Sequence, residues 1–344
     1  MGGQAVIEGV MMRSPRSFTV VCRRPDGSIA IKEEAWRPLW AGAKFLRLPF
    51  LRGAIVLLES LWNGISALTF SANQQMVEEQ KRDQQGKPKP RSLGAAAAKE
   101  PGDDSHLATY GMVAISLVFG LALFVGVPHL AAWGLGSVFG FDTTSVLFHL
   151  IDGAIKLALL IGYMAAISLM EDVRRVFQYH GAEHKAIFTY EQGLPLTVDN
   201  ARKQTRFHPR CGTSFLLIVI GVSIVLFSAL LTFTLVPNNT ALDHVAKIFI
   251  KIPLMFPVAG LAYELIKIAG KKCDTSRIAR GLSAPGMWLQ KITTREPTDD
   301  QLEIALLSIR KTLWREAQGE TDAGLSGCVE IYPSAESVDL PLAA

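Results

Sequence analysis

Three histidines and one cysteine of this chain have residue types and spacings that suit metal coordination. His180 and His184 are four residues apart, and Cys211 follows His208 three residues later. On a helix, His180 and His184 project from one face, and a tight turn would point both members of the second pair inward. A mixed set of imidazoles and a thiolate favours zinc. The sequence therefore predicts a Zn²⁺ site formed by His180, His184, His208 and Cys211.

A glutamate lies within the first histidine pair. The order His180-Gly181-Ala182-Glu183-His184 is that of the inverted zinc-protease motif, in which the glutamate activates a water molecule. Glu183 is therefore the candidate catalytic base. Catalysis needs an open coordination position for water, whereas four protein ligands would close the shell and make the metal structural. The sequence leaves both uses of the metal open.

Two other glutamates are weaker candidate ligands. Glu264 lies downstream of the histidine pair at a distance where inverted zinc proteases could place a third ligand. Its simpler interpretation is a charge at the cytoplasmic end of a helix, close to Lys267. Glu8 could approach the site if the N-terminal segment packs beneath the membrane, and a salt bridge is the alternative.

The candidate ligands lie between long apolar segments. Hydrophobic residues make up 49% of the 344 residues and are concentrated in blocks. Four blocks have about the 20 residues that a bilayer core requires: 107–133, 151–170, 215–236 and 248–269. We therefore predict an α-helical polytopic membrane protein with four transmembrane helices in residues 106–272, and with the metal site in the loop 171–213.

The distribution of Lys and Arg orients these spans. The links 134–144 and 237–243 contain neither residue, whereas the segment 171–213 and the flank after the fourth span contain several. By the positive-inside rule, both termini and the central loop are cytoplasmic, in a bacterial inner (plasma) membrane. The four cysteines are then in a reducing compartment, so we expect no disulfides.

The fourth apolar block is the least regular. Lys247 and Lys251 lie near its start, and we expect them to snorkel toward the outer interface. His149, Asp152 and Lys156 mark the outer end of the second span and could form a polar cluster. Ionisable residues are otherwise few in the spans, which argues against a transporter.

Six regions follow from these patterns. Residues 1–40 predict a cytoplasmic β region with a hairpin around Pro25-Asp26-Gly27, to which the segment from Gly3 to Arg13 could add a strand. Within 41–72, the apolar block 54–70 has basic residues on both sides, which favours an amphipathic helix on the membrane surface over a span. The other regions are a flexible linker at 73–105, the membrane domain, a cytoplasmic segment at 273–317 with an amphipathic helix at 299–317, and a disordered tail at 318–344.

Four motifs carry a resemblance to a known family. They are Gly3-Gln4-Ala5-Val6-Ile7-Glu8-Gly9-Val10-Met11-Met12-Arg13, His180-Gly181-Ala182-Glu183-His184-Lys185, His208-Pro209-Arg210-Cys211-Gly212-Thr213-Ser214-Phe215, and Pro285-Gly286-Met287-Trp288-Leu289-Gln290 followed by Thr293-Thr294-Arg295-Glu296-Pro297. On these motifs the chain resembles the YqhQ-like family of uncharacterised bacterial membrane proteins, commonly described as predicted metal-dependent enzymes. The resemblance implies a metal-dependent activity and no particular substrate.

Two functions fit the predicted site. The first is a metal-dependent hydrolase that acts on a peptide or a lipid-linked substrate at the inner leaflet. The second is a non-enzymatic scaffold or assembly factor, in which zinc shapes the loop and a basic surface meets a membrane or cytoplasmic protein partner. The expected environment is the lipid bilayer. The formal net charge of +4 gives no reason to expect a nucleic-acid partner.

Overall fold

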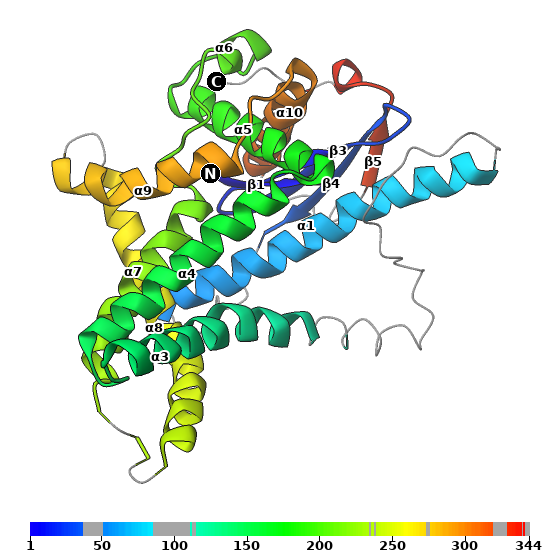
Figure 1. The fold of residues 1–344 in the computed structure, drawn as a ribbon. Coiled ribbons are helices and arrows are strands. Elements are labelled where there is room, and N and C mark those ends of the chain that lie inside the picture. Colours follow the sequence, from blue (N-terminus) through cyan, green and yellow to red (C-terminus); the bar gives the residue numbers. More distant parts are fainter. Residues whose placement is uncertain are drawn as a thin grey trace.

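The structure, a computed structural model, consists of an antiparallel sheet with helices on both faces that adjoins a group of long apolar helices (Figure 1). It describes residues 1–36, 51–84, 111, 115–233, 235–236, 239–272, 276–318, 329–338 and 340. Residues 41–50 of the predicted surface segment, 85–105 of the predicted linker, and 319–328 and 341–344 of the predicted tail lie outside this description.

The predicted N-terminal hairpin is the centre of a larger sheet. Strands β3 (Ser17–Arg23) and β4 (Ile29–Ala35) pair across the turn at Pro25-Asp26-Gly27. The segment before them forms two strands, β1 (Gly2–Val6) and β2 (Gly9–Arg13), where the sequence suggested one. The strand order is β1-β2-β3-β4-β5, so β1 lies at one edge of the sheet.

The fifth strand corrects the prediction of a disordered C-terminal tail. β5 (Val329–Tyr332) pairs antiparallel with β4, and the side chains of Ala335, Val338 and Leu340 join the main core. Four residues of alternating exposure are too short a pattern to indicate a strand. Pairing with β4, about 300 residues earlier in the chain, satisfies backbone groups that an isolated tail leaves to water.

Helices cover both faces of this sheet. α5 (Glu171–Glu191) and α10 (Asp299–Gln318) pack on one face, in a core that includes Ile31 and Leu306. α10 is the amphipathic helix predicted at 299–317. α1 (Leu51–Gln84) packs on the opposite face through Ala67. Each large aliphatic side chain buried here contributes about 1.5–3 kcal/mol, which holds the three helices on the sheet.

Five helical segments are long and apolar enough to cross a membrane. They are Arg52–Met76, Ile115–Phe139, Val146–Ile167, Gly212–Leu230 and Thr240–Gly270. These lie, in the same order, in α1, in η2 (Ala122–Gly126) with α3 (Val127–Phe139), in α4 (Val146–Ile167), in α7 (Gly212–Leu230) and in α8 (Thr240–Lys272). Four of the five match the predicted spans. The remaining segment lies in α1. This helix continues to Gln84, so residues 73–84 are helical and the prediction of a linker there is wrong.

Charged side chains join the apolar helices internally, and this corrects the expectation that two lysines snorkel. Lys251 on α8 is 1% exposed, and its Nζ lies 2.8 Å from Oδ2 of Asp152 on α4. Lys156 contacts the same oxygen at 2.7 Å. Lys247, also 1% exposed, pairs with Asp243 one turn earlier at 3.0 Å. Each lysine has an acidic partner close by, and this pairing lowers the cost of burying the ammonium group. The side chains therefore need not extend to the membrane interface.

Two shorter helices complete the surroundings of the central loop. α9 (Arg277–Thr293) begins at its N-cap Ser276 and packs against α7, where Gly286 leaves room for Ser214. α6 (Val198–Arg202) has Thr197 as its N-cap. The chain turns between α4 and α5, so α5 is a separate helix and not an extension of the second span.

Candidate metal centre

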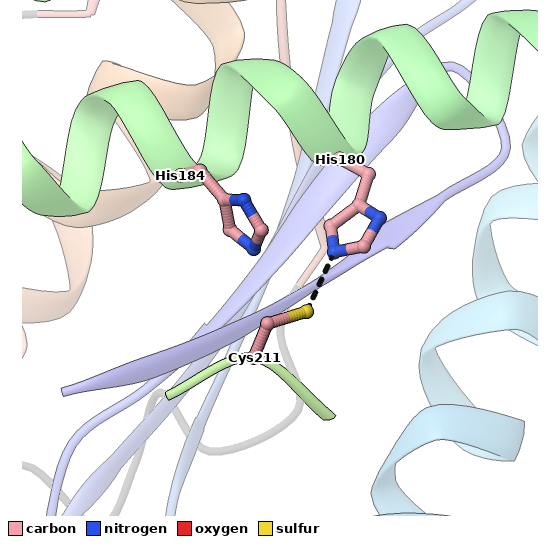
Figure 2. Close-up of side chains that lie close together, drawn as sticks. All are labelled: His180, His184 and Cys211. Atoms are coloured by element: carbon pink, nitrogen blue, oxygen red, sulfur yellow. Dashed lines mark hydrogen bonds between the residues drawn. The ribbon is translucent and has the colours of Figure 1, made fainter. Parts of the chain in front are cut away.

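Two imidazoles and a thiol converge at the start of α7. The ligand atoms of His180, His184 and Cys211 all lie within 4.8 Å of one another. Nε2 of His180 is 3.2 Å from Sγ of Cys211, and Figure 2 shows both rings projecting from the same side of α5 toward the cysteine. The predicted four-residue spacing on a helix therefore places both histidines as expected.

The position of α5 depends on the segment that follows α9. The N–H of Arg295 donates to the carbonyl of Phe177 at 2.8 Å. A side chain at Gly181 would overlap the Arg295 carbonyl, so only glycine permits this approach. The contact aligns the histidine-bearing turn of α5 with the end of α9.

Two backbone carbonyls hold the imidazole rings. Nδ1 of His180 lies 2.8 Å from the carbonyl oxygen of Thr293, and Nδ1 of His184 lies 2.6 Å from that of Arg206. A carbonyl only accepts, so each Nδ1 carries the proton and donates it. Each Nε2 is then left with the lone pair that coordinates a metal ion. Such outer contacts accompany metal-ligating histidines and fix their tautomer and orientation.

The loop that carries Cys211 is held by one buried glutamine. The side chain of Gln290 on α9 accepts from the His208 N–H at 2.8 Å and donates to the His208 carbonyl at 2.8 Å. It also lies 3.3 Å from Oγ of Ser214. Gln290 is 0% exposed, so these contacts take the place of hydration. Cys211 itself is the N-cap residue of α7.

His208, the predicted fourth ligand, lies beside this group but outside it. Its ring packs on Phe188 with centroids 4.6 Å apart, and its Nε2 lies 3.5 Å from Glu191. Its Nδ1 accepts from the Arg210 N–H at 3.3 Å. Burial, with a smaller contribution from the neighbouring His184, lowers the pKa of His208 to about 4, so the ring is neutral at pH 7. The structure thus brings together three of the four predicted ligands.

The two weaker candidates occupy other contacts. Glu8 pairs with Arg175 on α5, which is the salt bridge considered as its alternative. Glu264 on α8 forms a two-pronged ion pair with Arg52 on α1, at 2.5 Å for each hydrogen bond. Neither carboxylate belongs to the group of converging ligand atoms.

Glu183 is buried next to the converging ligands without belonging to their group. Its side chain contacts the backbone of β1, and a Cβ at Gly3 would lie 2.8 Å from Oε1 of Glu183. Burial raises the pKa of the Glu183 carboxyl to about 7, and the neighbouring His180 and the Gly3 N–H offset part of the rise. A carboxylate that stands near the ligands without joining them has the position of a general base.

A cavity of about 570 Å³ connects these groups. His180, Glu183 and Cys211 line one part of it, and residues 1–5 of the N-terminal segment line another. The rest of the wall is largely apolar and comes from α1, α5, α7 and α8: Val56, Leu57, Val176, Phe177, Ile187, Phe215, Tyr263 and Ile266. The site therefore opens into a space large enough for a substrate segment.

The residues that position the ligands were not predicted from the sequence. Thr293 and Gln290 are separated from the histidine pair by more than 100 residues, and their types carry no metal signal of their own. Their one signal in the sequence is the motif from Pro285 to Pro297, which indicated the family and no role in the site.

Comparison with known proteins identifies relatives of the whole chain. A family model described as "Protein of unknown function (DUF1385)" matches residues 48–315. The chain is 34% identical over 321 residues to the "Uncharacterized protein YqhQ" of Bacillus subtilis (strain 168), a match that covers 93% of this chain and 94% of that protein. No solved structure gives a significant match.

Proposed function

The chain belongs to the DUF1385 family, as its motifs indicated, and from that membership and the site geometry we propose that it is a zinc-dependent hydrolase of the bacterial plasma membrane. The observation that carries the proposal is the combination of His180, His184 and Cys211 with Glu183 along one cavity. Three protein ligands leave a coordination position open, as in catalytic zinc sites.

The donor set suits the chemistry. Zinc bound there polarises a carbonyl and makes water a good nucleophile near neutral pH. Nε2 of each histidine is free to coordinate because its Nδ1 proton is held by a backbone carbonyl. Glu183 accepts the proton of the attacking water and returns it to the leaving group.

The proposed topology has four spans, with the sheet and the metal centre in the cytoplasm. The basic residues of 171–213 support this orientation. The second half of α1 packs on the sheet through Ala67, and Oε1 of Gln74 accepts from Arg24 at 2.9 Å. Its outward face carries an exposed apolar stripe, composed of Leu58, Leu61, Trp62, Ile65 and Leu68. We therefore place α1 along the inner leaflet, because an α1 that crossed the bilayer would put the sheet and α5, which pack together, on opposite sides.

Metal analysis and one substitution test the hydrolase. We expect about one zinc per purified chain. Glu183→Gln should keep the zinc and the fold but fail to restore function in a strain that lacks the gene. Glu171→Gln, an exposed position on the same helix, is the matched control and should restore function fully. Complementation by Glu183→Gln at the wild-type level would refute the hydrolase.

A structural zinc site in a scaffold is the second candidate, and the position of His208 favours it. The rings of His184 and His208 lie 5.5 Å apart between centroids, so a small rotation would bring a fourth nitrogen toward the ion. In that case His208→Ala should release zinc, and X-ray absorption should show four protein ligands. Retention of zinc in His208→Ala, with a water oxygen in the coordination shell, would support the hydrolase.

A further inference from the structure

The edge strand β1 offers unpaired backbone groups beside the metal centre. β1 pairs with β2 alone among the described strands. Val6 and Gly9 flank a two-residue turn, so this pair exchanges backbone hydrogen bonds. In an antiparallel pair every second residue does so, which makes Gln4 and Gly2 the other residues of β1 that are hydrogen-bonded to β2. The N–H and C=O groups of Gly3 and Ala5 therefore point away from β2, toward the outer edge of the sheet.

This outer edge faces the cavity. Residues 1–5 line the same space as His180, Glu183 and Cys211. The Gly3 N–H is directed at the Glu183 carboxylate. Within the described residues, the C=O of Gly3 and both backbone groups of Ala5 face this edge without a strand partner, in position to pair with another extended chain. Small side chains at both positions keep this backbone accessible.

From this arrangement we infer that the substrate is an extended polypeptide segment, which adds to the outer edge of β1 and thereby places one of its peptide bonds at the metal centre. The inference rests on the proposed hydrolase function. Strand addition supplies affinity through main-chain hydrogen bonds, and the neighbouring walls select the side chains. The Gly3 N–H at this edge is directed at Glu183. A segment that pairs with β1 would therefore pass next to the proposed general base.

The walls of the cavity favour a polypeptide over a phospholipid. Within the part of the chain that the structure describes, Arg210 is the one Lys or Arg that lines the cavity, and it is ion-paired with Glu191. Apart from the proposed metal ion and the N-terminus, a phosphate headgroup would meet only this ion-paired arginine as a cation in the described lining. Apolar residues of three long helices, such as Leu57, Phe215 and Tyr263, instead suit large apolar side chains. We expect cleavage next to such residues, as occur in membrane-associated polypeptides.

The reaction is the hydrolysis of a peptide bond. Water adds to the carbonyl carbon of the peptide bond and the C–N bond breaks. Glu183 takes one proton from the water and delivers it to the leaving nitrogen. The products are a carboxylic acid and an amine, and no oxidant or second substrate is needed.

One substitution removes a single pairing group. Ala5→Pro deletes the outward N–H of Ala5 and leaves the hydrogen bonds between β1 and β2 in place, because a proline is tolerated where an edge N–H faces outward. Ala5→Gly is the matched control, since it removes the side chain and keeps the N–H. We expect Ala5→Pro to raise the KM for a polypeptide about tenfold, the value of one hydrogen bond of about 1.4 kcal/mol.

The experiment uses full-length, zinc-loaded protein in lipid nanodiscs with two separate probes. One is reduced, unfolded casein, with new peptide N-termini measured by mass spectrometry. The other is vesicles of phosphatidylethanolamine and phosphatidylglycerol, with released fatty acid and lysophospholipid measured. We expect the wild type to cut casein beside large apolar residues, Glu183→Gln to be inactive, and zinc content to be equal in all variants.

The outcomes separate the substrate from the function. Glu183-dependent cleavage of lipid alone would overturn the polypeptide inference and leave the hydrolase in place. Zinc-loaded wild type that cuts neither probe would count against both. Equal KM values for Ala5→Pro and Ala5→Gly would overturn the pairing with β1. N-methyl groups placed one at a time along a cleaved casein peptide test the wild-type protein directly, and inhibition should alternate from residue to residue.

Discussion

At the scale of single residues, the part of the chain that the structure describes contains two buried thiols in different environments. Cys211 converges with His180 and His184, whereas Cys22 is 0% exposed within β3. Burial raises the pKa of the Cys22 thiol to about 12, with a smaller contribution from Glu8. Since the thiolate is the reactive form, Cys22 is inert at neutral pH. The reactivity of Cys211 would instead depend on whether a metal ion is bound at the candidate site.

The rate of Cys211 alkylation at pH 8 therefore shows whether a metal ion is bound. In a Cys273→Ser, Cys328→Ser background, we expect iodoacetamide to modify Cys211 at least tenfold faster after zinc is removed with a chelator. Cys22 should react only after unfolding, because at pH 8 roughly one in 10,000 of its thiols is ionised. Peptide mass spectrometry distinguishes the two sites. Equal rates at Cys211 with and without zinc would contradict its role as a ligand.

Gly3 determines how closely Glu183, the proposed general base, approaches β1. A Cβ at this position would lie 2.8 Å from Oε1 of Glu183 and 2.8 Å from Sδ of Met12, whereas a Cβ at Gly2 has no neighbour within 4 Å. We expect Gly3→Ala to destabilise the fold by about 1–3 kcal/mol through overpacking and to displace the Glu183 carboxylate. Gly2→Ala should keep the wild-type unfolding temperature. A calorimetric scan of both variants checks this, and equal unfolding temperatures would contradict the close contact.

At the scale of elements, α4 and α8 are joined by a shared carboxylate. Oδ2 of Asp152 receives Lys156 and Lys251, and Nζ of Lys251 lies 3.1 Å from Nδ1 of His129 on α3. Asp152→Asn leaves two buried ammonium groups without a counter-charge. Loss of one partner of a buried pair costs about 3–5 kcal/mol.

Detergent-solubilised Asp152→Asn should therefore unfold at a clearly lower temperature than the wild type. Asp142→Asn, at an exposed position in the turn between α3 and α4, is the control and should behave as wild type. Adding Lys251→Met to Asp152→Asn should restore part of the stability, because one of the two unpaired charges is removed. An additive effect of the two substitutions would show that the side chains do not interact.

Local patterns in the sequence predicted the elements that depend on local physics. The four-residue spacing of His180 and His184 placed both on one face of α5, and apolar length located four long helices. Contacts between distant segments left no such pattern. β5 needs β4 as its partner, and the orientation of His208 follows from Phe188 and from Glu191. The spacing in the sequence predicts both His208 and Cys211 as ligands. The packing of the folded chain places only Cys211 in the converging group.

At the scale of the whole molecule, α1 connects the sheet to the group of long apolar helices. Its first turns pack against α8, where a side chain at Gly53 would lie 2.7 Å from Cβ of Tyr263. Its later turns cover the sheet through Ala67. One helix therefore contacts both the membrane bundle and the layer that carries the metal centre. In the proposed topology, an α1 that crossed the bilayer would put the sheet on the opposite side from its own partner α5, although both helices pack on the sheet.

Single cysteines test this arrangement in intact cells, in a background with Cys22, Cys273 and Cys328 replaced by serine. Asp142→Cys in an outer turn should react with a membrane-impermeant maleimide, whereas Lys203→Cys, beyond α6, should react only after permeabilisation. Asn73→Cys lies exposed on the part of α1 that follows the sheet contact. We expect it to behave like Lys203→Cys, because a surface helix keeps both of its ends on the cytoplasmic side. Reaction of Asn73→Cys in intact cells would make α1 a fifth span and would separate the sheet from the metal centre, contrary to the contact between Gly3 and Glu183.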